Sequence, residues 1–188
     1  MIPPGTAAVI LAAGASTRLG QPKQLVEIGG EMLLDRTVRI AEEAGCWPIV
    51  VVLGAEARRV LSRCSLQSVA VLVNPWWQEG MASSLRLGVA AVSSWSGAVV
   101  MTCDQPAVTA EHLQKLMNLG SLTASEYGGR RGVPAYFPAA NFPALLELTG
   151  DVGARELLKD AAVVELAGGE LDIDTAADLA EARNGFQR

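Results

Sequence analysis

Short apolar runs recur along the chain and alternate with longer segments in which apolar residues follow a helical spacing. The runs are rich in valine and isoleucine and have no polar face, as is typical of parallel strands covered on both sides. The intervening segments place apolar residues on one helical face and charges elsewhere. This alternation predicts an α/β fold in a single domain over residues 1–188, with a mostly parallel sheet flanked by helices. The strands are expected at Ala7–Leu11, Ile49–Leu53, Val69–Val73 and Ala98–Thr102, and the helices at Met32–Ala44, Ala55–Arg63 and Met81–Val92.

The last third of the chain is less regular. Leu122–Tyr127 and Pro134–Phe137 predict two strands around a glycine-rich turn at 128–132, and Val152–Leu158 predicts a helix. Thr175 suits the N-cap of a final helix, because its hydroxyl can accept a hydrogen bond from the first turn. The remaining expected elements are a short strand at Leu171–Ile173 and that final helix at Ala176–Arg183.

Composition and charge narrow the class of protein. Half of the 188 residues are apolar and 19% are charged, which is typical of a folded globular protein. The net charge is −5 and no block of lysine and arginine occurs, which argues against a general nucleic-acid or anionic-membrane surface. No apolar run approaches the roughly 20 residues that span a bilayer, and the N-terminus has no signal-peptide pattern. We expect a cytoplasmic protein that binds neither nucleic acid nor membranes.

The cysteines and the single histidine offer little chemistry. Cys46, Cys64 and Cys103 form no CxxC pair, which argues against a zinc site of the usual Cys/His type and favours reduced, buried thiols. His112 falls on a predicted surface helix, away from the candidate loops. Cys103 has no histidine placed by sequence to activate it, so packing is its favoured role.

The segment after the first predicted strand has the composition of an anion-binding loop. In open α/β sheets, ligands bind beyond the carboxyl ends of the strands. Leu11–Lys23 reads LAAGASTRLGQPK, in which small residues let backbone N–H groups approach an anion and two basic side chains add positive charge. The glycines are six residues apart and the lysine does not adjoin the second, so this is neither a Walker A loop nor a GxGxxG fingerprint. The candidate nucleotide-binding residues here are Leu11, Ala12, Ala13, Gly14, Ser16, Arg18 and Lys23.

Two aspartates that follow predicted strands are candidate Mg²⁺ ligands. Mg²⁺ is commonly held by one or two carboxylates together with substrate phosphates and water. Asp104 directly follows a buried strand, and Asp174, preferred over Asp172 because it lies nearer the predicted strand's end, supplies a second carboxylate. The alternatives are a turn-forming role for Asp104 before Pro106 and a helix-start charge for Asp174.

Polar residues also follow the third predicted strand. Asn74 and Gln78 are candidates to contact a base or ribose. Ser83 and Ser84 lie at a predicted helix start, where free N–H groups can face an anion. These residues extend the candidate site beyond the first loop.

Aromatic and basic residues nearby allow more than one interpretation. Trp76 and Trp77 favour packing for at least one of the two rings. Arg155, in the segment GDVGAR, is either a phosphate ligand or a surface arginine at a helix start.

The chain resembles the MobA/MocA-like nucleotidyltransferases, which include molybdenum cofactor cytidylyltransferases and guanylyltransferases. The resemblance runs from about Ala7 to about Ala182 and rests on LAAGASTRLGQPK, NPWWQEGMASSLRLGV, CDQP, GDVGAR and DIDTAADL, in that order. The first motif is specific for the wider nucleotidyltransferase superfamily, and the second with CDQP points to the MocA-like branch. The resemblance implies a Rossmann-like α/β sheet of the nucleotide-diphospho-sugar transferase type.

The resemblance also implies a reaction in which an NMP passes from an NTP to a phosphate-bearing acceptor, with pyrophosphate released and Mg²⁺ as cofactor. Arg18 and Lys23 match the triphosphate-binding pair, and Asp104 and Asp174 match the Mg²⁺ ligands. Arg18, Lys23 and Asp104 are therefore the expected catalytic residues. The segment near the nucleotide and acceptor is matched by Asn74, Ser83 and Ser84.

Two positions bear on the substrates. Ala12-Ala13 within LAAG is similar to cytidylyltransferases, whereas guanylyltransferases tend to have LAGG, so CTP is expected as the nucleotide and a molybdopterin-type cofactor as the acceptor. Many MocA-like proteins have His-Pro after Gly132, but this chain has Val133-Pro134, a departure that concerns the acceptor. Contact with a molybdoenzyme or its chaperone is a further implied partnership. The alternatives are GTP or ATP with another acceptor, and a non-catalytic module that binds a nucleotide or pterin cofactor.

Overall fold

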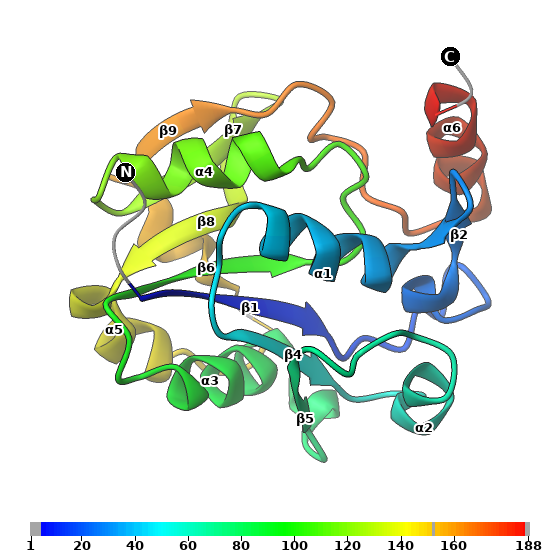
Figure 1. The fold of residues 1–188 in the computed structure, drawn as a ribbon, viewed down its shortest axis with the longest axis horizontal. Coiled ribbons are helices and arrows are strands. Elements are labelled where there is room, and N and C mark those ends of the chain that lie inside the picture. The colour runs from blue at the N-terminus through cyan, green and yellow to red at the C-terminus, as the bar shows by residue number, and fades with distance from the viewer. Residues whose placement is uncertain (1–4, 152, 187–188) are drawn as a thin grey trace.

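The computed structural model of the chain describes residues 5–151 and 153–186. Its centre is a seven-stranded sheet in the order β5-β4-β1-β6-β8-β7-β9 (Figure 1). Among these strands only β8 runs against its neighbours, and every other pairing is parallel. The predicted mostly parallel α/β sheet is confirmed. The strands are β1 (Thr6–Ala12), β4 (Ile49–Leu53), β5 (Ala70–Val73), β6 (Gly97–Thr102), β7 (Thr123–Tyr127), β8 (Arg130–Pro138) and β9 (Ala162–Glu165).

Helices cover both faces of the sheet, and alternate residues of β1 enter the two resulting cores. Ala8 and Ile10 pack on one face, whereas Ala7 and Val9 pack on the other. This burial on both faces explains why the central strands have no polar side. The first face is covered by α1 (Leu33–Glu43), α2 (Ala57–Leu61) and α4 (Ala110–Asn118), and the second by α3 (Met81–Ala91) and α5 (Phe142–Leu146).

A third apolar cluster joins the last helix to an early hairpin. The hairpin consists of β2 (Glu27–Ile28) and β3 (Glu31–Met32), and α6 (Ala176–Phe186) lies beside it (Figure 1). The buried side chains that connect them are Val26, Ile28, Leu33, Ile173, Leu179 and Ala182. This packing holds the segment before α6 next to the loop that follows β1.

The N-cap predicted for α6 is confirmed. The Asp178 N–H donates to Thr175 Oγ1 at 3.3 Å, and the Thr175 N–H donates to Asp178 Oδ2 at 2.7 Å. This reciprocal pair is a capping box with aspartate in place of glutamate. It fixes the direction in which the chain enters α6.

Two expected elements differ from the structure. Leu171–Ile173 is not a strand but an irregular segment, whose Ile173 N–H donates to the backbone oxygen of Asp104 at 2.9 Å. The strand at this edge of the sheet is instead β9, which pairs with β7. The predicted helix Val152–Leu158 is a 3-10 helix at Ala154–Leu158, and Val152 lies outside the described residues.

His112 is buried, not on the surface as expected. It is 5% exposed on α4, and its Nε2 lies 2.7 Å from Ser125 Oγ. Because the Ser125 hydroxyl donates to the Pro134 oxygen, the imidazole must donate to Ser125 and therefore carries its proton on Nε2. His112 thus ties α4 to the sheet and takes no part in the candidate site.

Acid is expected to destabilise the protein through His112. Burial, assisted by the Lys115 charge, lowers the pKa of His112 from 6.5 to about 4. Between about pH 4 and pH 6.5, the unfolded chain therefore binds a proton on His112 that the folded chain does not bind. The stability contributed by the neutral imidazole is full above pH 6.5 and is lost as the pH falls through 4, by about 3 kcal/mol in total. Urea unfolding across this range should show the loss in the wild type and a flatter profile in His112→Gln; equal slopes would contradict the assignment.

The three cysteines are free and buried, as expected. Burial raises the pKa of Cys46 and of Cys64 to about 12, and it also raises the pKa of Cys103. These thiols are therefore poor nucleophiles at neutral pH. Within the described residues, no helix is long and apolar enough to cross a membrane.

Candidate functional site

The carboxyl ends of the parallel strands meet two adjoining cavities. The glycine-loop cavity has a volume of about 490 Å³ and is formed chiefly by Leu11–Gly14 at the end of β1 and by Trp77–Met81 after β5. The aspartate cavity has a volume of about 550 Å³ and is formed chiefly by residues between 151 and 158, by residues after β6 and β9, and by the first half of β8. Because β8 runs in the opposite direction, its beginning lies at the edge where its neighbours end. Both cavities are lined by Lys23, Met81, Thr102, Asp104 and Asp151.

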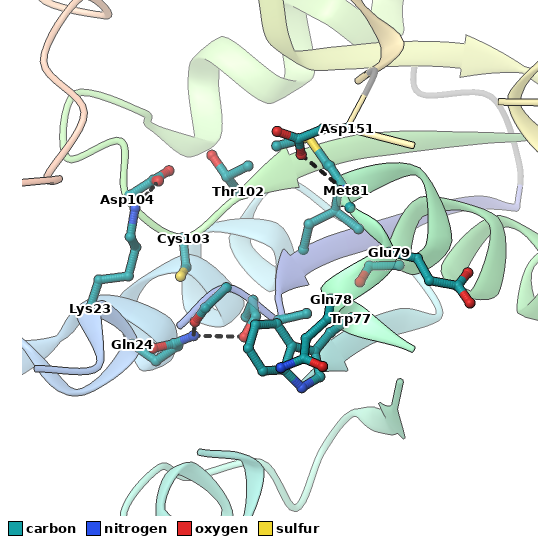
Figure 2. A pocket seen from close by; sticks show the side chains of 16 residues that line it. Lys23, Gln24, Trp77, Gln78, Glu79, Met81, Thr102, Cys103, Asp104 and Asp151 are labelled. Carbon is teal, nitrogen blue, oxygen red and sulfur yellow. Dashed lines mark hydrogen bonds and ion pairs between the residues drawn. The ribbon is translucent and has the colours of Figure 1, made fainter. Parts of the chain in front are cut away.

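Hydrogen bonds to its backbone carbonyl groups fix the conformation of the loop after β1. The Gln24 side-chain Nε2 donates to the Ala12 oxygen at 2.7 Å and to the Gly14 oxygen at 3.3 Å, and the Ala55 N–H donates to the Ala13 oxygen at 3.0 Å (Figure 2). In a trans peptide the N–H points opposite to the C=O. The N–H groups that follow the bonded Ala13 and Gly14 carbonyls therefore point away from these partners. This geometry is that of a backbone cradle for an anion.

Ser16 and Lys23 close the loop at its far end. Ser16 has a φ of 52°, and its Oγ accepts a hydrogen bond from the Lys23 N–H at 3.1 Å. The left-handed backbone at Ser16 turns the chain back towards the sheet. Gln24 then follows in a short 3-10 helix at Lys23–Leu25, so that Lys23 and Gln24 face the same cavity.

Replacing Gln24 is expected to loosen this loop. Gln24 is 1% exposed, and its Nε2 is a donor to two loop carbonyls. Gln24→Leu removes both hydrogen bonds. An unsatisfied buried carbonyl costs about 1–3 kcal/mol, so the loop should hold its binding conformation less well and the KM for the nucleotide should rise about tenfold. Steady-state kinetics would measure this, with Gln21→Leu on the exposed part of the loop as the control. An unchanged KM in Gln24→Leu would show that the loop holds its shape without the amide.

An ion cluster stands where the two cavities meet. Lys23 Nζ lies 2.7 Å from Asp104 Oδ2 and 2.7 Å from Asp174 Oδ1, and Arg18 Nη2 lies 2.7 Å from Asp174 Oδ2. Figure 2 shows the Lys23 side chain extending to Asp104. The structure thus brings together the four residues that were expected to be catalytic or metal-binding and are charged, from segments up to 156 positions apart.

The cluster shifts the ionisation of its members. Burial lowers the pKa of Lys23, but the Asp104 and Asp174 carboxylates outweigh it, so the pKa is raised and the amine stays charged. Burial raises the pKa of Asp174, but the Lys23 and Arg18 cations leave it lowered overall. Burial, together with the charges of Asp104 and Asp174, raises the pKa of the nearby Asp172 to about 6.

Two carboxylates within reach of one cation can hold a divalent metal ion. The described residues contain no group of three or more His, Cys, Asp or Glu side chains arranged to bind a metal. Asp104 and Asp174 nevertheless share a single cationic partner, the Lys23 ammonium, so both carboxylates can reach the same ion. Hard oxygen donors in this number suit Mg²⁺ when phosphates supply further ligands.

The polar residues after β5 bond to one another. Asn74 is 3% exposed; its Nδ2 donates to Ser83 Oγ at 2.8 Å and to Ser84 Oγ at 2.9 Å, and its Oδ1 accepts from the Trp76 N–H at 2.9 Å. Of Asn74, Ser83 and Ser84, only Ser84 lines the glycine-loop cavity. The group therefore anchors the start of α3 to the preceding loop.

The expectation of free N–H groups at the start of α3 is wrong. The Met81 N–H donates to Asp151 Oδ1 at 3.3 Å, and the Ala82 N–H donates to the Gly150 oxygen at 3.1 Å. Gly80 permits this contact, because a Cβ there would lie 2.4 Å from the Gly150 oxygen. The loop at 150–151 thus caps α3 from within the chain.

The remaining candidates divide between the cavities and the surface. Trp77 and Gln78 line the glycine-loop cavity, whereas Trp76 is 65% exposed. Arg155 and Val133 both line the aspartate cavity. Sequence reasoning assigned no role to four further lining residues, because only the tertiary fold brings them to the site: Gln24, Met81, Thr102 and Asp151.

The fold and the site together are typical of α/β transferases that bind nucleotides. The sheet is mostly parallel, and its carboxyl edge holds an anion-binding loop, two carboxylates that share Lys23, and two adjoining cavities. Comparison with known families agrees, because the model of the MobA-like NTP transferase domain matches residues 8–166. The chain belongs to this family and is a nucleotidyltransferase.

Curated relatives in this family carry different names. The chain is 33% identical over 168 residues to nicotine blue oxidoreductase of Paenarthrobacter nicotinovorans, covering 83% of this chain and 82% of the relative. It is 31% identical to the purine catabolism protein PucB of Bacillus subtilis, covering 89% and 90%. It is 25% identical to the molybdenum cofactor cytidylyltransferase of Escherichia coli, covering 95% of each.

Solved structures share the whole fold. Rv0371c from Mycobacterium tuberculosis H37Rv superposes with a TM-score of 0.85 at 30% identity, covering 98% of this chain and 100% of that one. A structure described as Rv0371C in complex with manganese superposes with a TM-score of 0.78 at 29% identity, covering 96% and 98%. Manganese has thus been observed in complex with a protein of this fold.

Proposed function

We propose that the protein transfers CMP from CTP to a phosphate-bearing acceptor of the molybdopterin or molybdenum cofactor type and releases pyrophosphate. The observation that carries the proposal is the position of Lys23 and Asp104. Both residues line both cavities, and this position supports a reaction between a nucleotide bound in one cavity and an acceptor bound in the other.

The glycine-loop cavity is assigned to the nucleotide. The N–H groups of Gly14 and Ala15 point away from the hydrogen-bonded carbonyls, and in this proposal they bind triphosphate oxygens together with Lys23. Arg18, which lines the adjoining aspartate cavity, supplies a second cation to the triphosphate in this proposal. Cationic and N–H donors that face the leaving pyrophosphate stabilise the charge that develops on it. The preference for CTP rests on Ala12-Ala13 and on the likeness to the E. coli cytidylyltransferase.

The carboxylates of Asp104 and Asp174 are assigned to Mg²⁺. These two carboxylates would hold the ion, which when bound would supply positive charge to offset the negative charge that develops on the phosphates. For both carboxylates to serve it, Lys23 Nζ must leave its position 2.7 Å from each and turn towards the triphosphate. The lysine then exchanges two carboxylate partners for phosphate partners, and its charge is compensated in both positions.

The aspartate cavity is assigned to the acceptor. An acceptor phosphate beside Asp104 would be positioned for direct in-line attack on the α-phosphorus, with no protein nucleophile. Arg155 is the proposed ligand of an acceptor anion, and the apolar side chains of Val133 and Leu158 offer contact to an uncharged part of the acceptor. Contact with a molybdoenzyme or its chaperone would follow from delivery of the finished cofactor.

A panel of nucleotides tests the proposal. Purified protein with Mg²⁺ is mixed with CTP, GTP or ATP, and thermal shifts and pyrophosphate release are measured with and without molybdopterin. CTP-dependent pyrophosphate release that requires the acceptor supports the proposal. Release with GTP or ATP instead would reassign the nucleotide, and stabilisation by nucleotide without any pyrophosphate would indicate a binding module. Since one relative is named an oxidoreductase, NADPH with a dye acceptor is the parallel control, and turnover there alone would overturn the proposal.

A further inference from the structure

A third cavity lies outside the site described above and is rich in arginine. The hairpin cavity, of about 390 Å³, lies between the β7–β8 hairpin and the 3-10 helix at Ala154–Leu158. Arg130 and Arg131 reach it from the hairpin, and Arg155 and Lys159 reach it from the other side. Four of the chain's fifteen basic residues thus gather around one concavity in a protein of net charge −5.

Among residues 5–151 and 153–186, three of these cations have no salt-bridge partner. Lys159 pairs with Glu156. Within the described residues, Arg130, Arg131 and Arg155 form no salt bridge, although Glu126 also lines the cavity. Elsewhere in the same chain, Arg39 pairs with two glutamates. Unpaired guanidinium groups that line one hollow repel each other and attract an anion.

The hairpin that holds two of the arginines is well defined. Its turn residues Gly128 and Gly129 have φ values of 54° and 68°, as a tight two-residue hairpin turn requires. Arg130 pairs with Tyr127 and Arg131 with Glu126 in the ladder. The two arginines therefore project from a paired strand rather than from a free loop, which reduces the entropy lost when they bind a ligand.

The hairpin cavity adjoins the aspartate cavity. Arg155 and Glu156 line both of them, so a ligand that extends from the aspartate cavity past these two side chains would meet the hairpin arginines. Arginine forks bind phosphate and carboxylate groups in a bidentate manner. A site of this size suits one such group rather than a large macromolecular surface.

We infer that the hairpin cavity is a second anion-binding subsite, and that the acceptor carries a second anionic group besides the phosphate that reacts. Arg130, Arg131 and Arg155 bind this second group. The identity of the acceptor rests on the proposed function, but the existence of the subsite does not.

A titration of the wild-type protein with inorganic phosphate tests the subsite without any assay of turnover. The arginine side-chain Nε–H signals are followed by NMR. Arg130, Arg131 and Arg155 should shift together with one dissociation constant, about tenfold lower than that of Arg58 and Arg59 on α2. Shifts no stronger than those of these two surface arginines would overturn the inference.

A bridging ligand tests the continuity of the two cavities. By calorimetry, hexanediol bisphosphate should bind about tenfold more tightly than hexyl phosphate. Arg130→Gln/Arg131→Gln should abolish this difference, whereas Arg58→Gln/Arg59→Gln, with the same loss of charge, should keep it. Equal affinities for the two ligands in the wild type would refute a shared path. Failure of the nucleotide panel with success here would reject the proposed reaction and leave the subsite standing.

Discussion

Asp104→Ala protein is expected to retain its fold and to lose at least about 10²–10³-fold in turnover. Asp104 lines both cavities, and its carboxylate is one of two that can face a metal ion there. Removing one electrostatic contact that acts in the transition state typically costs about 3–4 kcal/mol, which corresponds to this factor. The measurement is pyrophosphate release at saturating CTP, Mg²⁺ and acceptor.

The control for this experiment is Asp160→Ala, which removes an exposed aspartate that lines neither of the two cavities. Circular dichroism and thermal melting of both variants should match the wild type within a few degrees. Near-native turnover by Asp104→Ala would reject the assigned metal site together with the proposed reaction.

Lys23→Met protein is expected to show a comparable loss of about 10²–10³-fold in kcat/KM for the nucleotide, because the triphosphate loses a buried cation. A second expected effect distinguishes the loss of triphosphate binding from a general loss of folding. Without the ammonium, Asp104 and Asp174 face each other with no cation between them, so the like charges should lower the melting temperature.

Mg²⁺ should offset this second effect. In the absence of nucleotide, added Mg²⁺ should raise the melting temperature of Lys23→Met more than that of the wild type, in which the lysine already occupies the space between the carboxylates. Lys115→Met, which removes an exposed lysine from α4, is the charge-matched control. An equal response to Mg²⁺ in all three proteins would show that the two carboxylates do not bind the metal together.

The fold could be predicted where strands are buried on both faces. β1, β4 and β6 are free of polar side chains except for Thr6 and Thr102 at their ends, so their pattern is unambiguous. β9 was missed because it is an edge strand with mostly exposed side chains. Leu171–Ile173 imitates a strand because Ile173 packs under α6 between two charged neighbours, which produces alternation without a ladder.

The candidate site could be predicted where chemistry follows a strand end. Lys23 and Asp104 lie together as their positions after β1 and β6 suggested, and Asp174 joins them although the strand predicted before it does not form. Contacts between separate segments have no pattern in the sequence that predicts them. Asp151 caps a helix that begins 70 residues earlier, and Gln24 binds carbonyl groups of the loop that precedes Gln24. The Asn74 side chain is of a type that can hydrogen-bond a nucleotide base, yet its amide donates to Ser83 and Ser84 instead.

Because α6 packs on the β2–β3 hairpin rather than on the sheet, Asp174 of the candidate site can move away while the two cores of the sheet stay folded. Asp174 directly precedes the Thr175–Asp178 capping box, and the cluster that holds α6 is distinct from the two cores of the sheet. A small, peripheral cluster opens at a lower free energy than a buried sheet. Detachment of α6 would carry Asp174 away while the seven strands remain paired, so heating should inactivate the enzyme reversibly before the protein melts.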